Sequence, residues 1–121
     1  MKLKILIVDD SEPFREILRG LLVQVGFDDV IEAANYDEAI VKYRTEKPDL
    51  VFIDMILPGK SGVEITKAIL EIDPKATVIA ISSMINKAVI KDALAAGAKD
   101  FLLKPTNEMA LNIVIEMWGK E

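Results

Sequence analysis

Three short, uninterrupted runs of apolar residues constrain the fold of this chain more than any other feature. They are Ile5 to Val8, Leu50 to Ile53 and Val78 to Ile81, and most of their residues are branched. Such runs are typical of strands that are covered on both faces of a parallel sheet. Val30 to Ala34 and Phe101 to Leu103 are weaker candidates of the same kind. The sequence therefore predicts five strands.

The segments between these runs carry helix start and stop signals. The predicted N-caps are Ser11 (with Pro13 in the first turn), Asn35 (with Glu38), Ser61 (with Glu64), Asn86, and Thr106 or Asn107, and the predicted ends include Gly26 and Gly97. Strand and helix thus alternate five times, which predicts an α/β fold with right-handed crossovers and helices on both faces of one parallel sheet. With 121 residues, we expect a single domain over residues 1–121.

Polar residues follow four of the five runs directly. Asp9 and Asp10 follow the first run, Asp54 the third, Ser82 the fourth and Lys104 the fifth. Because the carboxyl ends of parallel strands share one edge of the sheet, where ligands of such folds bind, we expect these side chains to meet there.

The residue types at this edge predict a particular chemistry. Converging carboxylates repel one another unless a hard divalent cation lies between them, and Mg²⁺ with its oxygen ligands suits three aspartates best. Mg²⁺ bound this way usually shares phosphate oxygens, for which Lys104 and Ser82 are suitable donors. A carboxylate can act as a nucleophile and form an acyl phosphate, which is the role we predict for Asp54.

Composition excludes several other functions. The chain has neither cysteine nor histidine, which rules out thiolate catalysis, disulfides and imidazole chemistry and fits a cytoplasmic location. A net charge of −5 argues against a nucleic-acid surface. The apolar run near the N-terminus ends at Val8, too short for an export signal or a membrane span, so we expect no membrane insertion.

The combination of Asp9-Asp10, Asp54, Ser82 and Lys104-Pro105 at these spacings resembles the receiver domain of two-component response regulators. The similarity covers the whole chain and is greatest to the single-domain chemotaxis type, the CheY-like proteins. It implies a doubly wound, flavodoxin-like sheet of five parallel strands in the order 2-1-3-4-5 with five helices, and this strand order is taken from the resemblance alone.

The resemblance also implies roles for individual residues. A sensor histidine kinase would donate a phosphoryl group to Asp54, with Mg²⁺ held by Asp10, Asp54 and the backbone carbonyl of Ile56. Asp9 would act mainly through bound water, and Lys104 would contact the phosphoryl oxygens. The protein would accept phosphate and lose it slowly, without being a turnover enzyme.

Further implied roles concern the response to phosphorylation. Ser82 would move to hydrogen-bond the phosphoryl group, Phe101 would follow it inward, and Pro105 would follow a cis peptide bond. Ile56 and Met84 occupy the two positions that flank the path of attacking water in this family. Because neither side chain can orient water, we predict slow self-dephosphorylation.

The last predicted helix is apolar around most of its circumference. Polar residues recur at every fourth position there, at Glu108, Asn112, Glu116 and Lys120, which leaves an apolar surface wider than packing on a sheet requires. A docking or homodimer surface made of Ile90, Leu94, Phe101 and Trp118 is one interpretation, and a broad buried stripe is the other.

Other functions remain open from the sequence. A small aspartate-nucleophile phosphatase would need an aspartate in place of Ile56, and a flavodoxin-like electron carrier would need a phosphate-binding loop where Asp9 and Asp10 stand. The chain ends soon after its fifth helix, so at natural length no output domain is expected, and a flagellar motor switch or a kinase is the expected partner. A phosphorelay intermediate, or a receiver cut from a longer transcriptional regulator, would look the same.

Overall fold

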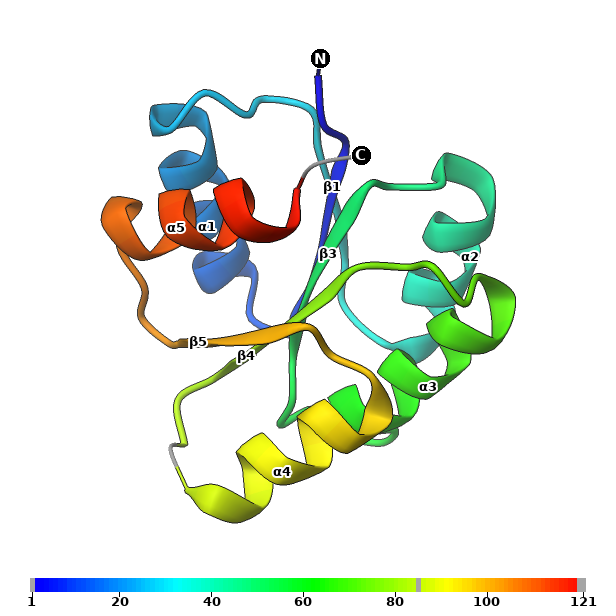
Figure 1. The fold of residues 1–121 in the computed structure, drawn as a ribbon. Coiled ribbons are helices and arrows are strands. Elements are labelled where there is room, and N and C mark those ends of the chain that lie inside the picture. Colours follow the sequence, from blue (N-terminus) through cyan, green and yellow to red (C-terminus); the bar gives the residue numbers. More distant parts are fainter. Residues whose placement is uncertain (1, 85, 120–121) are drawn as a thin grey trace.

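The computed structural model describes residues 2–84 and 86–119, and over this range five strands alternate with five helices (Figure 1). The strands are β1 (Ile5–Val8), β2 (Val30–Ala33), β3 (Leu50–Asp54), β4 (Val78–Ser82) and β5 (Asp100–Leu103). The helices are α1 (Glu12–Gln24), α2 (Tyr36–Glu46), α3 (Gly62–Ile72), α4 (Lys87–Ala96) and α5 (Glu108–Trp118).

All strand pairs are parallel, and the sheet order is β2-β1-β3-β4-β5. The order and fold class implied by the resemblance are therefore confirmed. Two strands reach one residue further than the apolar runs, so that Asp54 and Ser82 are themselves the last residues of β3 and β4. The backbones of Asp54 and Ser82 are therefore paired with neighbouring strands, which fixes the points from which their polar side chains project.

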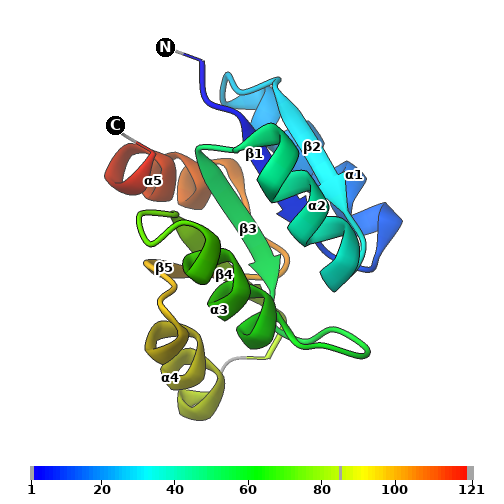
Figure 2. The same ribbon diagram turned by 90° about the vertical axis from the view of Figure 1, so that its right-hand side faces the viewer.

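The helices cover the sheet as two layers. Helices α1 and α5 lie side by side on one face, and α2, α3 and α4 cover the other (Figures 1 and 2). Successive residues of β1 divide between these layers, because side chains alternate across a strand: Ile5 and Ile7 pack under α1 and α5, and Leu6 and Val8 pack under the other helices. Burial on both faces explains why the strands read as continuous apolar runs.

The predicted caps determine where the helices begin. In each helix the side chain of the residue before it accepts a hydrogen bond from a backbone N–H of the first turn, and these caps are Ser11, Asn35, Ser61, Asn86 and Asn107. Of the two candidates for the last helix, Asn107 is the cap. Gly97 caps the C-terminus of helix α4, as predicted, and its φ of 112° is a conformation that favours glycine.

Candidate functional site

The candidate site lies at the carboxyl ends of β1 and β3. Asp9 follows β1 and is 1% exposed, Asp54 ends β3 and is 6% exposed, and Asp10 is exposed at the rim. One carboxylate oxygen from each of the three lies within 4.8 Å of the other two. The predicted convergence of these aspartates is therefore present in the fold.

Lys104 joins the two buried carboxylates. Its Nζ donates to Asp9 Oδ2 at 2.8 Å and to Asp54 Oδ2 at 3.0 Å. It also lies 4.3 Å from the centre of the Phe14 ring, on whose face a cation is attracted. Lys104 follows β5 directly, and the Lys104–Pro105 peptide bond is cis. One ammonium group therefore partly neutralises two charges that would otherwise repel each other.

Backbone N–H groups hold the other oxygen of each buried carboxylate. Ser11 N donates to Asp9 Oδ1 at 2.8 Å, and Ile56 N donates to Asp54 Oδ1 at 2.9 Å. Each donor lies two residues after its aspartate, at the start of the loop that leaves the strand. The orientation of each buried carboxylate is thus fixed by a backbone N–H on one oxygen and by the Lys104 ammonium on the other.

The environment shifts two pKa values at this site. Burial raises the pKa of Asp54, and the negative charge of Asp9 adds to the effect, while the Ile56 N–H and the Lys104 ammonium oppose it. Burial alone would lower the pKa of Lys104, but its hydrogen bonds to Asp9 and Asp54 outweigh burial and raise it. The lysine therefore stays charged beside its two partners.

The donor set fits Mg²⁺. Three carboxylates at the ends of two adjacent strands bring hard oxygen ligands within 4.8 Å of one another, and water and phosphate oxygens would complete the shell of a bound ion.

Ser82 is fully buried at the end of β4, and its Oγ accepts a hydrogen bond from Met84 N at 3.1 Å. Ile56 and Met84, the residues that follow Asp54 and Ser82 by two positions, are each 50% exposed. Phe101 on β5 is half-buried and packs against the core under α2, α3 and α4. Ser82, Ile56 and Met84 lie at the predicted edge, where the Ile56 N–H donates to Asp54, whereas Phe101 lies inside β5 and pairs with Ala80 in the middle of β4.

The surface predicted around the last two helices is only partly exposed. Leu94 is 49% exposed, whereas Ile90 and Trp118 are half-buried, and Trp118 Nε1 donates to Asp100 Oδ2 at 2.8 Å. Leu111, Val114 and Ile115 form the buried face of α5, and the exposed apolar side chains of that helix are Met109, Ile113 and Met117.

Sequence reasoning missed the charged network beside the site. Arg15 and Arg19 on α1 both bind Glu32 on β2, and Arg15 also reaches the backbone oxygen of Asp9. The available signal was the four-residue spacing of two arginines on one helix face opposite a glutamate in a mostly apolar strand. Phe14, one residue earlier on the same helix, was likewise not predicted as a contact of Lys104.

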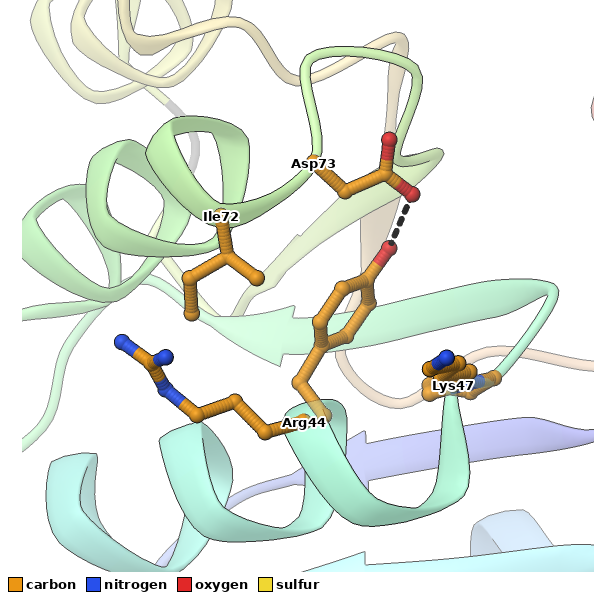
Figure 3. Close-up of a pocket in the computed structure, with 6 residues that line it drawn as sticks. Arg44, Lys47, Ile72 and Asp73 are labelled. Carbon is orange, nitrogen blue, oxygen red and sulfur yellow. Dashed lines mark hydrogen bonds between the residues drawn. The ribbon is translucent and has the colours of Figure 1, made fainter.

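A separate pocket, drawn in Figure 3, adjoins the segment that precedes β3, at the end of that strand opposite to Asp54. Tyr43, Arg44 and Lys47 of the α2 end and Asp73 after α3 line it, and the Tyr43 hydroxyl donates to Asp73 Oδ2 at 3.1 Å. Burial raises the pKa of Tyr43, and the Asp73 hydrogen bond adds to this effect. Because this pocket adjoins the amino end of β3, it is not continuous with the aspartate cluster.

Within residues 2–84 and 86–119, no helix combines the length and apolar character that crossing a bilayer requires.

Comparison with known proteins gives consistent matches along the chain. Residues 5–116 match the model of the response regulator receiver domain. The chain is 40% identical to a chemotaxis protein CheY of Thermotoga maritima over 102 residues, which cover 84% of this chain and 85% of the relative. It is 42% identical to the Bacillus subtilis chemotaxis protein CheY, with the same coverage. Among solved structures, Vibrio cholerae chemotaxis protein CheY4 superposes with a TM-score of 0.90 at 25% identity, covering 98% of this chain and 99% of that one.

Proposed function

The chain belongs to the family of response regulator receiver domains, and from this membership we propose that Asp54 accepts a phosphoryl group from the histidine of a sensor kinase. The observation that carries the proposal is the buried Asp54 carboxylate, which shares the Lys104 ammonium with Asp9 at the strand ends. In the transfer, the phosphorus–nitrogen bond of phosphohistidine breaks and a phosphorus–oxygen bond forms to Asp54. The released imidazole nitrogen takes up a proton.

The carboxylate cluster supports a Mg²⁺ site for this reaction. Asp10, Asp54 and the backbone carbonyl of Ile56 would hold the ion, and Asp9 would contribute through a bound water. When bound, the ion would stabilise negative charge on the transferred group. Lys104 is held by Asp9 and Asp54 at hydrogen-bond distance, so its ammonium is already near the position of the phosphoryl oxygens.

A switch follows from the charge that phosphorylation adds. An acyl phosphate brings about −1.5 to −2 charges and three acceptor oxygens to a buried edge, as other phosphorylated side chains do. Ser82 Oγ would turn from the Met84 N–H toward these oxygens, and Lys104 would shift from Asp9. The half-buried Phe101 would fill the space that Ser82 vacates, which changes the surface near α4 and β5.

The test of this function is the intact mass of the protein after incubation with acetyl phosphate, with Mg²⁺ or with EDTA. We expect the wild type to gain one phosphoryl group with Mg²⁺ only, and Asp54→Asn to gain none. A known receiver domain in the same buffers is the positive control. An unmodified wild type beside a modified control would refute the proposal, and a modified Asp54→Asn would place the acceptor elsewhere.

The proposed setting is two-component signalling in the cytoplasm. The relatives named chemotaxis protein CheY support a chemotaxis or motility pathway, with a kinase as donor and a motor switch protein or kinase as target. Each molecule would accept one phosphoryl group and later lose it by self-dephosphorylation, so the protein would not turn over a separate substrate.

A phosphatase of the aspartate-nucleophile type is disfavoured by Ile56, since its side chain cannot serve as a general acid.

For the partner we propose the surface of Ile90, Leu94, Phe101 and Trp118, which would bind a target or a second copy of the chain. Leu94 is its exposed member, so Leu94→Glu would weaken association of the acetyl-phosphate-treated protein in sedimentation velocity. Val41→Glu, at a 59% exposed position on α2, is the matched control. A wild type that sediments as a monomer in both states would exclude the homodimer.

A further inference from the structure

Arg15 connects helix α1, strand β2 and the end of β1 through a single side chain. Its Nη1 donates to the backbone oxygen of Asp9 at 2.6 Å, and its Nε donates to Glu32 Oε1 at 2.8 Å. The Arg15 side chain is only 14% exposed, so both bonds are largely shielded from water. A planar guanidinium can make two such bonds in fixed directions.

The backbone oxygen that Arg15 binds belongs to the peptide bond between Asp9 and Asp10. The remaining polar atoms of Asp9 are also bonded: its N–H donates to Ala33 O, Oδ1 accepts from Ser11 N, and Oδ2 accepts from Lys104. Asp10 itself is exposed. The direction in which the chain leaves Asp9 therefore depends on the peptide plane, and Arg15 holds that plane.

Glu32 holds Arg15 in turn. One carboxylate oxygen, Oε1, accepts from Arg15, and the other, Oε2, accepts from Arg19 Nε at 2.9 Å and Nη2 at 2.6 Å. Partial burial would raise the pKa of Glu32, but the two arginines outweigh it and hold the pKa below its usual value. Glu32 is thus a charged anchor in the middle of β2, and its neighbour across the ladder is Ile7 of β1.

We propose that Arg15 is a positioning residue for the metal ligands: it orients the Asp9–Asp10 peptide so that the Asp10 carboxylate faces the cation together with Asp54. The inference rests on the proposed Mg²⁺ site. Groups that orient metal ligands without touching the metal commonly change metal affinity by about 10 to 100-fold.

Charge and geometry make opposite predictions for this residue, which makes the inference testable. Arg15 carries a positive charge next to a proposed cation site, so a purely electrostatic role would mean that its removal strengthens metal binding. If Arg15 orients the ligands, its removal weakens binding despite the lost repulsion. The sign of the change in affinity therefore separates the two explanations.

The experiment compares Arg15→Gln with Arg19→Gln, titrated with Mn²⁺ as the probe and followed by the electron paramagnetic resonance of free Mn²⁺. Both variants lose one arginine that binds Glu32, but only Arg15 contacts Asp9. We expect Arg15→Gln to bind Mn²⁺ about tenfold more weakly. Arg19, with a side chain 39% exposed, is expected to change the affinity by less than about twofold. Unchanged or tighter binding by Arg15→Gln, or equal losses in both variants, would overturn the inference.

A second variant, Arg15→Lys, keeps the positive charge but lacks the planar guanidinium that donates to the Asp9 backbone oxygen and to Glu32 in fixed directions. We expect it to bind Mn²⁺ as weakly as Arg15→Gln, and an affinity equal to that of the wild type would overturn the inference, because the fixed directions of the guanidinium bonds would then not be needed. Thermal unfolding without metal establishes that each variant is folded at the titration temperature.

The same variants separate this inference from the proposed phosphorylation. With acetyl phosphate, the Mg²⁺ concentration that gives half the maximal rate should rise about tenfold in Arg15→Gln, in parallel with its weaker metal binding, while the rate at saturating Mg²⁺ stays close to that of the wild type. A wild type that binds Mn²⁺ but is not phosphorylated would refute the proposed function, and the Mn²⁺ affinities would still decide the role of Arg15. A wild type that binds no Mn²⁺ would refute the inference.

Discussion

Asp54 shows how a single residue can be both buried and available for chemistry. Its carboxylate is 6% exposed, yet each oxygen has a donor: Ile56 N binds Oδ1 and Lys104 Nζ binds Oδ2. A buried charge without such partners would be costly. The arrangement therefore explains why an apolar strand can end in aspartate.

At the same scale, Ile56 and Met84 should determine how long the acyl phosphate lasts. Both are half-exposed next to the site, and neither can orient an attacking water. We expect Ile56→Asn combined with Met84→Glu to accelerate phosphate loss by about tenfold, less than the 10² to 10⁴ typical of a fully positioned acid-base group. The measurement is the decay of the phosphorylated mass after removal of acetyl phosphate.

The α5 helix offers matched controls for this pair. Ile113→Asn and Met117→Glu make the same substitutions at positions that are 54% and 58% exposed and belong to another element. They should leave the decay rate unchanged. Equal lifetimes for the wild type and the Ile56/Met84 variant would show that water access is controlled by other residues.

At the scale of elements, the close approach of helix α3 to strand β3 depends on Gly62. A Cβ on this first residue of α3 would overlap the backbone oxygen of Asp54 and lie 2.6 Å from Met55 Cα. The loop between strand and helix thus returns directly over the backbone of the proposed acceptor. A larger residue would move Asp54 or the helix.

We therefore expect Gly62→Ala to lower the free energy of unfolding by about 1 to 3 kcal/mol, as forced overpacking does. It should also slow phosphorylation, because the overlapping atom belongs to Asp54. Gly20→Ala is the control, since Gly20 is an exposed residue of α1 and a Cβ added there would meet nothing within 4 Å, and the substitution should stabilise the protein by about 0.5 to 1 kcal/mol. Urea unfolding measures both, and an unchanged Gly62→Ala would mean that the loop yields without cost.

The ion pairs between α1 and β2 should give the stability of the protein a pH dependence. The pKa of Glu32 is lowered in the folded state, so its contribution is present above its unfolded pKa, near 4.5, and is lost as pH falls through the folded value. We expect Glu32→Gln to be less stable than the wild type at neutral pH, with a difference that shrinks below about pH 4.5. Urea unfolding at several pH values measures this difference.

Glu46→Gln is a suitable control, because Glu46 pairs with Lys4 at a more exposed position. Its effect should be smaller throughout. If the difference between Glu32→Gln and the wild type stayed constant down to pH 3, the arginine contacts would not be the source of the Glu32 contribution.

At the scale of the whole molecule, the sheet separates two hydrophobic layers, and the proposed site lies at one edge of it. The layer under α1 and α5 and the layer under α2, α3 and α4 share the central strands, so the ends of β1 and β3 are held from both sides. Such support keeps three carboxylates together in spite of their repulsion. Lys104 neutralises only part of the negative charge, and a bound cation would be stabilised by relieving the repulsion that remains between the carboxylates.

Binding of Mg²⁺ should therefore stabilise the whole fold. A ligand at about 100 times its dissociation constant adds about 2.7 kcal/mol when it binds only the folded state. We expect the thermal midpoint of the wild type to rise with Mg²⁺, and that of Asp10→Asn to rise much less, because it lacks one of the three carboxylates. Asp92→Asn, at an exposed position of α4, should respond like the wild type. An equal response in Asp10→Asn would argue against Asp10 as a ligand.

Much of this molecule can be predicted from its sequence for a simple physical reason. Apolar runs and capping residues are local signals, and parallel strands place all their carboxyl ends at one edge, so the sequence predicts that Asp9, Asp54 and Lys104 lie along that edge. Their contacts through the Lys104 ammonium also depend on which strands are neighbours. The strand order itself came from the resemblance, because no local signal specifies which strands are neighbours.

Other features were decided only by the tertiary structure. Whether Trp118 faces solvent or Asp100 depends on how α5 is rotated on the sheet, and a helix that is apolar on most sides does not specify its own rotation. The contacts of Arg15 with Glu32 and Asp9 depend on the distance between α1 and β2, which the packing of the core determines. Local sequence thus determined the elements and the residues at their ends, while packing between elements decided which long side chains reach the site, because such reach depends on distances that no single segment contains.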